Sequence, residues 1–365
     1  MFNDDAAVGV ALANIVRTTS ILLSWIWTFN RVMNSMTSVE RLKEYTEFKD
    51  HEAGWVNEED SKLPSNWPTQ GKIEIKNLKA RYRKGLPLVI NGLNVDIEAR
   101  QKIGVVGRTG SGKSTLMLAL MRILEMAEEG KKEGGHIKID GADIYGLGLH
   151  KVRKALTIIP QDPFLLEGTL RSNLDPVDKH TTEELIEGLT TVEFFSTIKK
   201  EEFEALRKKL AKKSEKERKN RKIDMVDDDG DKDSKTPDLT EDELLQLPIE
   251  QSGSNLSLGQ RQLICIARAL VNKPKILLMD EATASVDQKT DEIIQRVIME
   301  EMGETTILTI AHRINTIIGY DKILVMDKGR KAEEGSPREL LELGGIFSGM
   351  VDDCGGGLRE MVLGE

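Results

Sequence analysis

The 365-residue sequence predicts an α/β fold built on parallel strands, and three observations support this prediction. Runs of mostly apolar residues at 103–106, 276–279 and 306–310 have the length and composition of buried strands. Helical patterns at 113–125 and 258–271 lie between such runs. A glycine-rich segment joins the first run to the first helical pattern. Strands that alternate with helices in this way form a parallel sheet covered by helices.

Further apolar segments predict additional strands. Residues 73–75 and 93–97 alternate apolar and polar side chains, which is typical of strands with one face toward solvent. We therefore expect an additional antiparallel β part near the beginning of the domain. Three more short strands are expected at 137–139, 156–159 and 323–326.

Composition indicates a globular chain with one abnormal segment. Charged residues make up 31% of the sequence, against roughly 25% in an ordinary domain. The excess lies in residues 199–246, which hold 14 basic and 15 acidic side chains in 48 positions. Because no apolar periodicity continues past Leu210, we expect a solvated insertion with a helical start. The alternative is a regulatory segment with the phosphate-accepting side chains Ser214, Ser234, Thr236 and Thr240.

Charge balance and cysteine content exclude several classes of protein. The net charge of −9 argues against a dedicated nucleic-acid binder, which needs a basic face. The two cysteines, Cys265 and Cys354, supply neither a disulfide framework nor zinc-ligand spacing. A reducing compartment fits this content, and the chain is long enough to bury a core without disulfides.

Residues 6–29 are the most apolar stretch, and their length of about 24 residues would span a bilayer. Arg17 opposes insertion, because a central arginine costs about 2.5–3.5 kcal/mol on insertion scales. Trp25 and Trp27, followed by Arg31, suit the interface at the cytoplasmic end of a transmembrane helix. The acidic start of the chain disfavours a signal peptide. From this stretch alone, a transmembrane helix and a soluble amphipathic helix both stay open.

Residues 35–71 predict the end of a helix and a polar linker. Ser38 is placed to cap a charged helical segment. Pro64, Asn66 and Pro68 then interrupt regular structure. We therefore expect the compact domain to begin at about Lys72.

The most specific motif is Gly107-Arg-Thr-Gly-Ser-Gly-Lys-Ser114, which stands between a predicted strand and a predicted helix. This order of strand, GxxxxGK[ST] loop and helix defines a phosphate-binding loop. The glycines let backbone N–H groups curl around phosphate, and the helix N-terminus adds partial positive charge. Lys113 would reach the β- and γ-phosphates, and the Ser114 hydroxyl would coordinate Mg²⁺. The motif predicts nucleoside triphosphate binding.

A second motif is the apolar run 276–279 followed by Asp280 and Glu281. Two carboxylates at the carboxyl end of a buried strand lie where open α/β sheets bind their ligands. Asp280 would hold Mg²⁺ through water, and Glu281 would orient and deprotonate the attacking water as the general base. Taken alone, the motif is also compatible with an acidic turn after a strand.

A third motif, Asn255-Leu-Ser-Leu-Gly-Gln260, precedes the second helical pattern. It resembles the signature sequence of the ATP-binding-cassette (ABC) ATPases, usually LSGGQ. Leu258 replaces the first glycine, as in the second nucleotide-binding domain of the multidrug-resistance-associated subfamily, whereas Ser257 and Gly259 are kept. The resemblance implies that four residues act on the ATP of a partner domain: Ser257, Leu258, Gly259 and Gln260.

Four further segments match motifs of this family, and they stand along the chain in the order that the family shows. Ile159-Pro-Gln161 resembles the Q-loop, whose glutamine would contact Mg²⁺ and the attacking water. Ala284-Ser-Val-Asp287 resembles the D-loop, and Ile310-Ala-His312 resembles the switch segment, whose histidine would contact the γ-phosphate. Tyr82, 25 residues before Gly107, fits the aromatic residue that stacks on adenine. Taken alone, these positions also fit a turn, a structural histidine and a strand aromatic.

The resemblance assigns each of these residues a role by position. ATP binding falls to Tyr82, Gly107, Arg108, Thr109, Gly110, Ser111, Gly112, Lys113, Ser114, Thr115 and Gln161. Catalysis falls to Glu281, His312, Lys113 and Gln161, and the metal ligands are Ser114, Gln161 and Asp280.

The resemblance covers about residues 35–352 and also aligns residues 6–29 with the last transmembrane helix of a second membrane domain. It therefore favours the transmembrane reading of that stretch. The expected domain is an ABC ATPase with a parallel-strand core, an antiparallel β subdomain and an α-helical subdomain. The expected division is a residual transmembrane helix at 1–34, a linker at 35–71, the ABC ATPase at 72–345 and a C-terminal tail at 346–365.

The resemblance implies ATP hydrolysis by the cytoplasmic cassette of a membrane exporter, with ATP and Mg²⁺ as cofactors. Because two cassettes face head to tail in this family, the implied partners are a second nucleotide-binding domain, the transmembrane domains and the membrane, but no nucleic acid. The family's transported molecules are organic anions, conjugates or drugs. A nucleotide-gated regulator or channel and a soluble ABC ATPase remain the alternatives.

Overall fold

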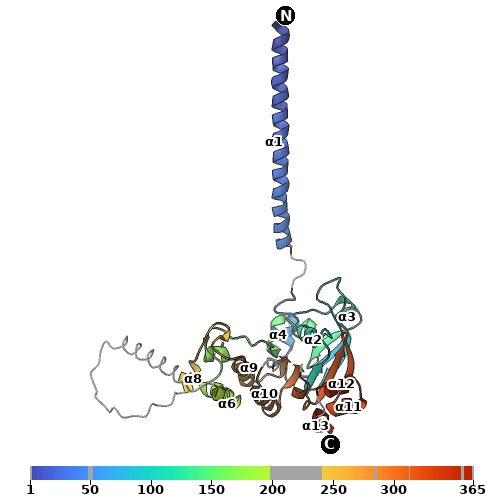
Figure 1. Ribbon diagram of the computed structural model, residues 1–365, viewed down its shortest axis with the longest axis vertical. Coiled ribbons are helices and arrows are strands. Elements are labelled where there is room, and N and C mark those ends of the chain that lie inside the picture. The colour runs from blue at the N-terminus through green and yellow to red at the C-terminus, as the bar shows by residue number, and fades with distance from the viewer. Residues whose placement is uncertain are drawn as a thin grey trace, which may run out of the picture. The chain divides into compact units, whose positions relative to one another are not determined.

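The computed structural model describes residues 2–47, 52–197, 241–282, 286–311, 313–354 and 357–363. It divides into two compact units, Met1–Ala53 and Gly54–Glu365, which are described separately (Figure 1). Most of the predicted charged insertion lies outside the described residues. The same holds for His312 and for the first part of the predicted D-loop.

Among the described residues of the first unit, 2–46 form one helix, α1 (Phe2–Thr46). Ser38 lies inside this helix rather than at the start of a second one, because no proline or glycine after Gly9 interrupts the helical backbone. From Ala7 to Thr46 the helix is long and apolar enough to cross a membrane, with a mean hydropathy of 1.5 in its most apolar window. That measure rests on length and composition alone, and none of the window is buried.

The second unit is organised around a six-stranded sheet. Five of its strands are parallel, and the edge strand β12 is antiparallel to its neighbour β11. In spatial order the strands are β12 (Arg330–Gly335), β11 (Lys322–Asp327), β3 (Lys102–Val106), β10 (Thr306–Ile310), β9 (Ile276–Asp280) and β6 (Leu156–Ile159). The predicted parallel core is confirmed, and its strands include those expected at 103–106, 156–159, 276–279, 306–310 and 323–326.

A smaller antiparallel sheet confirms the expected β subdomain. Its order is β2 (Ile90–Ile97), β1 (Ile73–Ala80), β4 (His136–Ile139) and β5 (Ala142–Asp143). A third pair joins β7 (Gly168–Thr169) to β8 (Pro248–Ile249).

Helices cover the large sheet and form a separate group at one end of the unit (Figure 1). That group, the α-helical subdomain, contains α5 (Leu170–Leu174), α6 (Thr182–Thr191), α8 (Glu241–Leu245) and α9 (Leu258–Asn272). The other α-helices are α2 (Lys113–Leu120), α3 (Glu128–Lys132), α4 (Leu149–Ala155), α10 (Gln288–Glu300), α11 (Pro337–Leu343), α12 (Ile346–Asp353) and α13 (Gly357–Leu363). Short 3₁₀ helices are η1 (Glu58–Lys62), η2 (Ile144–Gly146), η3 (Phe194–Thr197), η4 (Gln251–Gly253) and η5 (Ile314–Thr316).

The helix α2 ends at Leu120, five residues before the expected end of its pattern. Arg122 adopts a left-handed backbone conformation with φ of 51°, which stops the helix. Its guanidinium is buried, and it donates to the carbonyls of Ile144 and Leu147 at 2.8 and 2.7 Å. The hydrogen bonds of the buried guanidinium therefore stabilise the fold more than another turn of α2 would.

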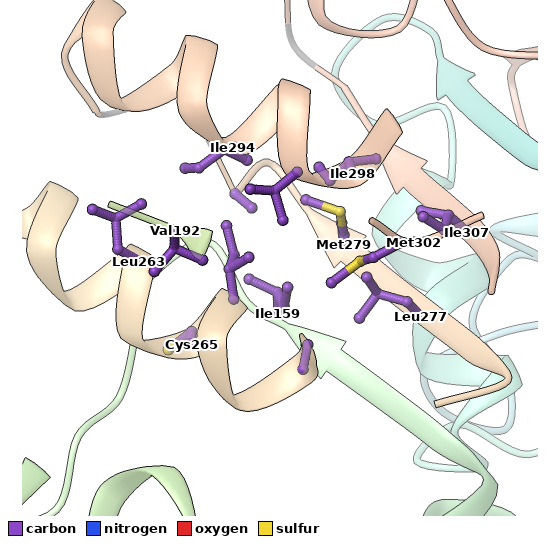
Figure 2. Close-up of a cluster of buried hydrophobic side chains, with 14 of the residues drawn as sticks. Ile159, Val192, Leu263, Cys265, Leu277, Met279, Ile294, Ile298, Met302 and Ile307 are labelled. Atoms are coloured by element: carbon purple, nitrogen blue, oxygen red, sulfur yellow. The ribbon is translucent and has the colours of Figure 1, made fainter. Parts of the chain in front are cut away.

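Two hydrophobic clusters cover the opposite faces of the large sheet, as the alternation of side chains along a strand requires. Leu277 and Met279 of β9 belong to the cluster packed beneath α9 and α10, whereas Ile276 and Leu278 belong to the other cluster. Figure 2 shows the first cluster, in which Leu263 of α9 lies with side chains from the strands and α10. The helical subdomain and the sheet therefore share one continuous core.

The compact unit extends beyond both ends of the expected 72–345 domain. On the N-terminal side, the Asp60 carboxylate accepts from the Gly148 N–H at 2.8 Å, and Trp67 is buried. On the C-terminal side, Phe347 and Val351 of α12 are fully buried because their four-residue spacing places both on one helix face. Part of the expected linker and tail thus packs onto the cassette.

Asp140 ties the chain entering β1 to the antiparallel sheet. Its carboxylate accepts four backbone N–H groups, from Thr69, Gln70, Gly71 and Lys72, at 2.7–3.2 Å. Burial alone would raise the pKa of Asp140, but these four donors outweigh it and hold the pKa below its ordinary value. The charged form is therefore favoured by folding.

We predict that Asp140→Ala lowers the free energy of unfolding by about 2–3 kcal/mol, because backbone donors lose a charged acceptor. A depressed folded-state pKa gives stability that is present above the unfolded pKa of about 3.9 and lost as the pH falls through the folded value. The difference between variant and wild type should thus shrink in acid. Denaturant titrations followed by circular dichroism at neutral and acid pH measure both effects.

The control is Glu342→Ala, which removes an exposed carboxylate paired with Arg338 one helical turn away. It should change the stability by less than about 0.5 kcal/mol. Equal stabilities of Asp140→Ala and this control would contradict the assignment.

Candidate functional site

Four parallel strands end at the same edge of the large sheet. Ile310 pairs with Val105 on one side and with Asp280 on the other, and Met279 pairs with Ile159. The residues that follow β3, β10, β9 and β6 therefore emerge together, at the edge where α/β sheets bind ligands. These residues carry the glycine-rich loop and three other predicted motifs.

The glycine-rich loop needs glycine where it leaves β3. A Cβ atom on Gly107 would lie 2.2 Å from the carbonyl oxygen of Met326 in β11, and the φ of this residue is +152°. Gly112 caps α2 in the left-handed region with φ of 103°. Only glycine adopts such conformations without strain, so these positions set the course of the loop around the start of α2.

The Lys113 side chain folds back over the loop. Its ammonium donates to the Gly107 carbonyl at 2.7 Å and to the Arg108 carbonyl at 3.3 Å, and the residue is only 7% exposed. Burial lowers the pKa of Lys113, and the nearby Glu281 and Asp280 carboxylates partly oppose that shift. The Lys113 ammonium thus interacts both with carbonyls of the glycine-rich loop and, electrostatically, with the Asp280 and Glu281 carboxylates.

Asp280 and Glu281 stand at the end of β9. Burial raises the pKa of Asp280, as does the adjacent Glu281, whereas Lys113 lowers it. The Glu281 backbone has a left-handed φ of 47°, and its N–H donates to the Ile310 carbonyl at 3.0 Å. Backbone strain of this kind is common where a side chain must take a fixed direction at a functional site.

The residues present fit a hard divalent cation bound together with phosphate. Ser114 has an exposed hydroxyl in the first turn of α2, Asp280 contributes a half-buried carboxylate, and Gln161 is exposed after β6. Oxygen donors of this kind suit Mg²⁺, which takes few protein ligands and several from water and phosphate. Within the described residues no cluster of three or more acidic, histidine or cysteine side chains forms a separate metal cage.

Tyr82 is tied to the same loop. Its hydroxyl lies 3.2 Å from the Thr115 hydroxyl, on the helix that begins at the loop. The side chain is nevertheless 54% exposed, so a large part of it is open to solvent. This arrangement fits stacking against a flat ring whose phosphates lie in the loop.

The signature residues form the N-terminus of α9. Ser257 and Gln260 make a reciprocal capping box, in which the Ser257 N–H donates to Gln260 Oε1 at 2.8 Å. Gly259 is buried against α10, where a Cβ atom would lie 3.3 Å from Asp287 Oδ1. Asp287 itself caps α10 and accepts from Thr290. The structure thus brings the signature and the D-loop aspartate together.

Two groups of predicted residues are therefore separate. The first contains the loop from Gly107 to Thr115 with Tyr82, Asp280 and Glu281, and the second contains Ser257–Gln260 with Asp287. The first group lies at the carboxyl edge of the sheet, whereas the second is formed by the N-termini of α9 and α10. His312 lies outside the described residues, although the preceding Ala311 N–H donates to the Val105 carbonyl at 3.1 Å.

Gln262 is a residue that sequence reasoning missed. It is 1% exposed in α9, and its Nε2 donates to the Pro160 carbonyl at 3.5 Å, next to Gln161. A signal was present, because Gln262 lies three and four residues from Gly259 and Ile266, on the buried stripe of the helix. A polar residue on such a stripe indicates a specific contact.

Strand, glycine-rich loop, helix and acidic strand end together define a P-loop nucleoside triphosphate-binding domain. The ABC transporter family matches residues 90–284, which is more than half of the chain. The chain belongs to the ABC transporter family and carries its ATP-binding cassette.

Two curated relatives match nearly the whole chain. ATP-binding cassette sub-family C member 2 of Homo sapiens is 40% identical over 348 residues, which are 95% of this chain and 19% of the relative. The ATP-dependent bile acid permease of Saccharomyces cerevisiae is 41% identical over 338 residues, 93% of this chain and 19% of the relative. The chain therefore spans about a fifth of the length of these relatives. The resemblance to the C subfamily is confirmed.

A solved structure gives the same fold. The structure of a bacterial Atm1-family ABC exporter with ATP bound matches with a TM-score of 0.64 and 25% sequence identity. The match covers 90% of this chain and 48% of the exporter chain. The predicted α/β cassette fold is confirmed.

We predict that Lys113→Ala raises the dissociation constant for ATP about 10- to 100-fold, because a charge-assisted hydrogen bond contributes about 1.5–3 kcal/mol. Titration of the full chain with a fluorescent ATP analogue measures this constant. Lys154→Ala, which removes an equal charge from the exposed face of α4, is the matched control and should bind ATP as the wild type does. Unchanged affinity of Lys113→Ala would refute the phosphate contact.

Proposed function

We propose that this chain is the hydrolysis-competent ATPase cassette of an ABC exporter and that its ATP cycle drives transmembrane transport. The observation that carries the proposal is that the phosphate-binding loop after β3 and the Asp280–Glu281 pair at the end of β9 emerge at the same carboxyl edge of the parallel sheet. A phosphate-binding loop beside a strand-end carboxylate pair is the arrangement that ATP hydrolysis requires. Glu281, one of that pair, makes this site competent for hydrolysis.

In the proposed site each residue has a distinct task. The loop N–H groups and Lys113 hold the phosphates, and the exposed Tyr82 ring stacks on adenine. Ser114, Gln161 and Asp280 would hold Mg²⁺, which supplies charge neutralisation between the β- and γ-phosphates. Glu281 orients a water molecule in line with the γ-phosphate and accepts its proton. His312, two residues after β10 in the sequence, is the residue that would contact the γ-phosphate.

The separation of the two residue groups supports a paired cassette. The signature at Ser257–Gln260 and the D-loop aspartate Asp287 lie together at the N-termini of α9 and α10, whereas the first group lies at the carboxyl edge of the sheet. In a head-to-tail pair they would reach the ATP of the second nucleotide-binding domain, whether in the same longer chain or in a partner chain. The chain alone should therefore bind ATP and turn it over slowly.

The N-terminal helix supports attachment to a membrane domain. The described side chains of α1 from Ala7 onward are exposed, including Leu22, Trp25 and Trp27. Hydroxyl side chains inside the apolar part bond back to the helix, as Thr18 does to the Asn14 carbonyl at 2.7 Å. Such bonds satisfy polar groups in lipid. Residues 1–34 are thus proposed as the end of the last transmembrane helix of a multi-pass protein, with residues 35–71 as the linker and the cassette facing the cytoplasm.

The proposed cargo class is the organic anions, conjugates and drugs of the C subfamily. The yeast relative is described as a bile acid permease, which is an example of organic anion transport. The cargo site itself would lie among membrane helices outside this chain. Residues 72–345, with the insertion at 199–246, are proposed as the cassette, and 346–365 as its tail.

We predict that Glu281→Gln keeps ATP binding within about twofold and reduces hydrolysis at least about 100-fold, because general-base catalysis contributes about 10²–10⁴-fold. Single-turnover assays at high protein concentration, where two copies can supply each other's signature, measure hydrolysis. The control Glu187→Gln, an exposed carboxylate on α6, should keep the wild-type rate. Retained hydrolysis in Glu281→Gln would show that another group is the base.

We predict that residues 1–45 fused to a soluble reporter resist alkaline carbonate extraction from membranes. The matched control is Leu22→Arg in the same fusion, since a second arginine in the apolar stretch adds about 2.5–3.5 kcal/mol to insertion. The control should fractionate more strongly into the soluble phase. A wild-type fusion that is fully soluble would overturn the transmembrane assignment.

A further inference from the structure

The buried side-chain amide of Gln262 makes fewer hydrogen bonds than its groups allow. A glutamine side chain offers two N–H donors and an acceptor oxygen with two lone pairs. In the described residues it makes one long hydrogen bond, from Nε2 to the Pro160 carbonyl at 3.5 Å, and its Oε1 is buried without a partner. Buried polar groups are rarely left in this way, so each exception needs an explanation.

Its surroundings do not require a polar side chain. Neighbouring residues of α9, among them Leu263 and Cys265, belong to the hydrophobic cluster, as does Ile159 of β6 (Figure 2). In such a cluster an apolar side chain of the same length packs at least as well and leaves no amide unsatisfied. The amide is therefore not explained by core packing.

The two ends of the contact belong to different functional parts. Pro160 follows the last residue of β6 and precedes Gln161, the residue proposed to reach the nucleotide held by this chain. Gln262 lies in the second turn of α9, two residues after Gln260. Gln260 and Ser257 belong to the signature and cap the helix. One side chain thus joins the loop of this chain's ATP site to the helix that presents the signature.

Both neighbouring segments are more exposed than the contact itself. Gln161 and Ser257 are exposed, whereas Gln262 is almost fully buried. A displacement of Gln161 would carry the adjoining Pro160 carbonyl with it, because the two are linked by one peptide bond. The amide at the outer limit of hydrogen-bond length has room to shorten its bond, and Oε1 remains able to accept another donor.

We propose that Gln262 is a positioning residue that couples nucleotide binding at the Q-loop of this chain to the signature at the start of α9. The proposal rests on the proposed ATPase function. When Gln161 engages the nucleotide, the Pro160 carbonyl moves relative to the Gln262 amide. The helix α9 moves with this carbonyl because the Gln262 side-chain amide is hydrogen-bonded to it. The signature residues at the start of α9 then become ordered for the second cassette.

The test uses Gln262→Met in the full chain. Methionine has nearly the same length and no amide, so it removes the contact with Pro160 and the unpaired acceptor together. Hydrogen exchange of the backbone is measured by mass spectrometry with and without a non-hydrolysable ATP analogue and Mg²⁺. The peptides that matter cover residues 157–167 and 255–261.

In the wild type the analogue should slow exchange in both peptides. In Gln262→Met the protection of 157–167 should remain, whereas the protection of 255–261 should fall at least threefold. Nucleotide affinity and melting temperature should stay at the wild-type values, because the variant touches neither the phosphate loop nor a required buried charge. A residue with a merely structural role would not separate these two peptides.

The matched control is Cys265→Ala, which truncates another buried side chain of α9, three residues further on. It should keep the response of both peptides. Equal responses of Gln262→Met and wild type, or a wild type that binds the analogue without protecting 255–261, would overturn the coupling. A wild type that fails to bind the analogue would instead refute the proposed ATPase function.

Discussion

The parallel register of β3, β10 and β9 is the constraint on which the whole site depends. Because Ile310 pairs with both Val105 and Asp280, the three strands end at one level. A slip of one residue would turn each strand-end side chain to the opposite face of the sheet. The contact of Gly107 with the Met326 carbonyl adds β11 to this alignment and fixes where the phosphate loop leaves the sheet. Ligand geometry is thus set by strand pairing before any ligand binds.

Burial explains the opposite pKa shifts in the site. Lys113 and Asp280 both lose water, so burial lowers the pKa of the lysine and raises that of the aspartate. Each partly restores the charged form of the other, and two loop carbonyls accept from the ammonium. The ammonium gains only partial compensation from neutral carbonyls. A bound polyphosphate would supply the negative charge that the buried ammonium lacks. The burial that disfavours the charged form of Lys113 therefore favours an anionic ligand.

Sequence patterns predicted the strands and the phosphate-binding loop, but not where α2 ends or which flanking segments pack on the core. Strand positions follow from short apolar runs, and the phosphate loop from residues whose spacing its chemistry requires. The early end of α2 depends on the buried partners of Arg122, about 20 residues further on, which no local pattern contains. The packing of α12 likewise depends on a core shared with distant strands. Gln262 was missed because a glutamine close to the signature has the sequence pattern of an exposed, polar start of a helix.

The helix α9 carries two requirements that a single element rarely combines. Its N-terminus carries the exposed Ser257, which is proposed to reach a second cassette, whereas its later turns pack in the same cluster as Leu277 and Met279 of β9 (Figure 2). The strand β9 ends in Asp280 at the ATP site of this chain. Since protein interiors are close-packed and transmit strain, the signature and the carboxylate pair cannot shift independently. In the proposed cassette pair, the packing of this one helix would therefore couple the two ATP sites.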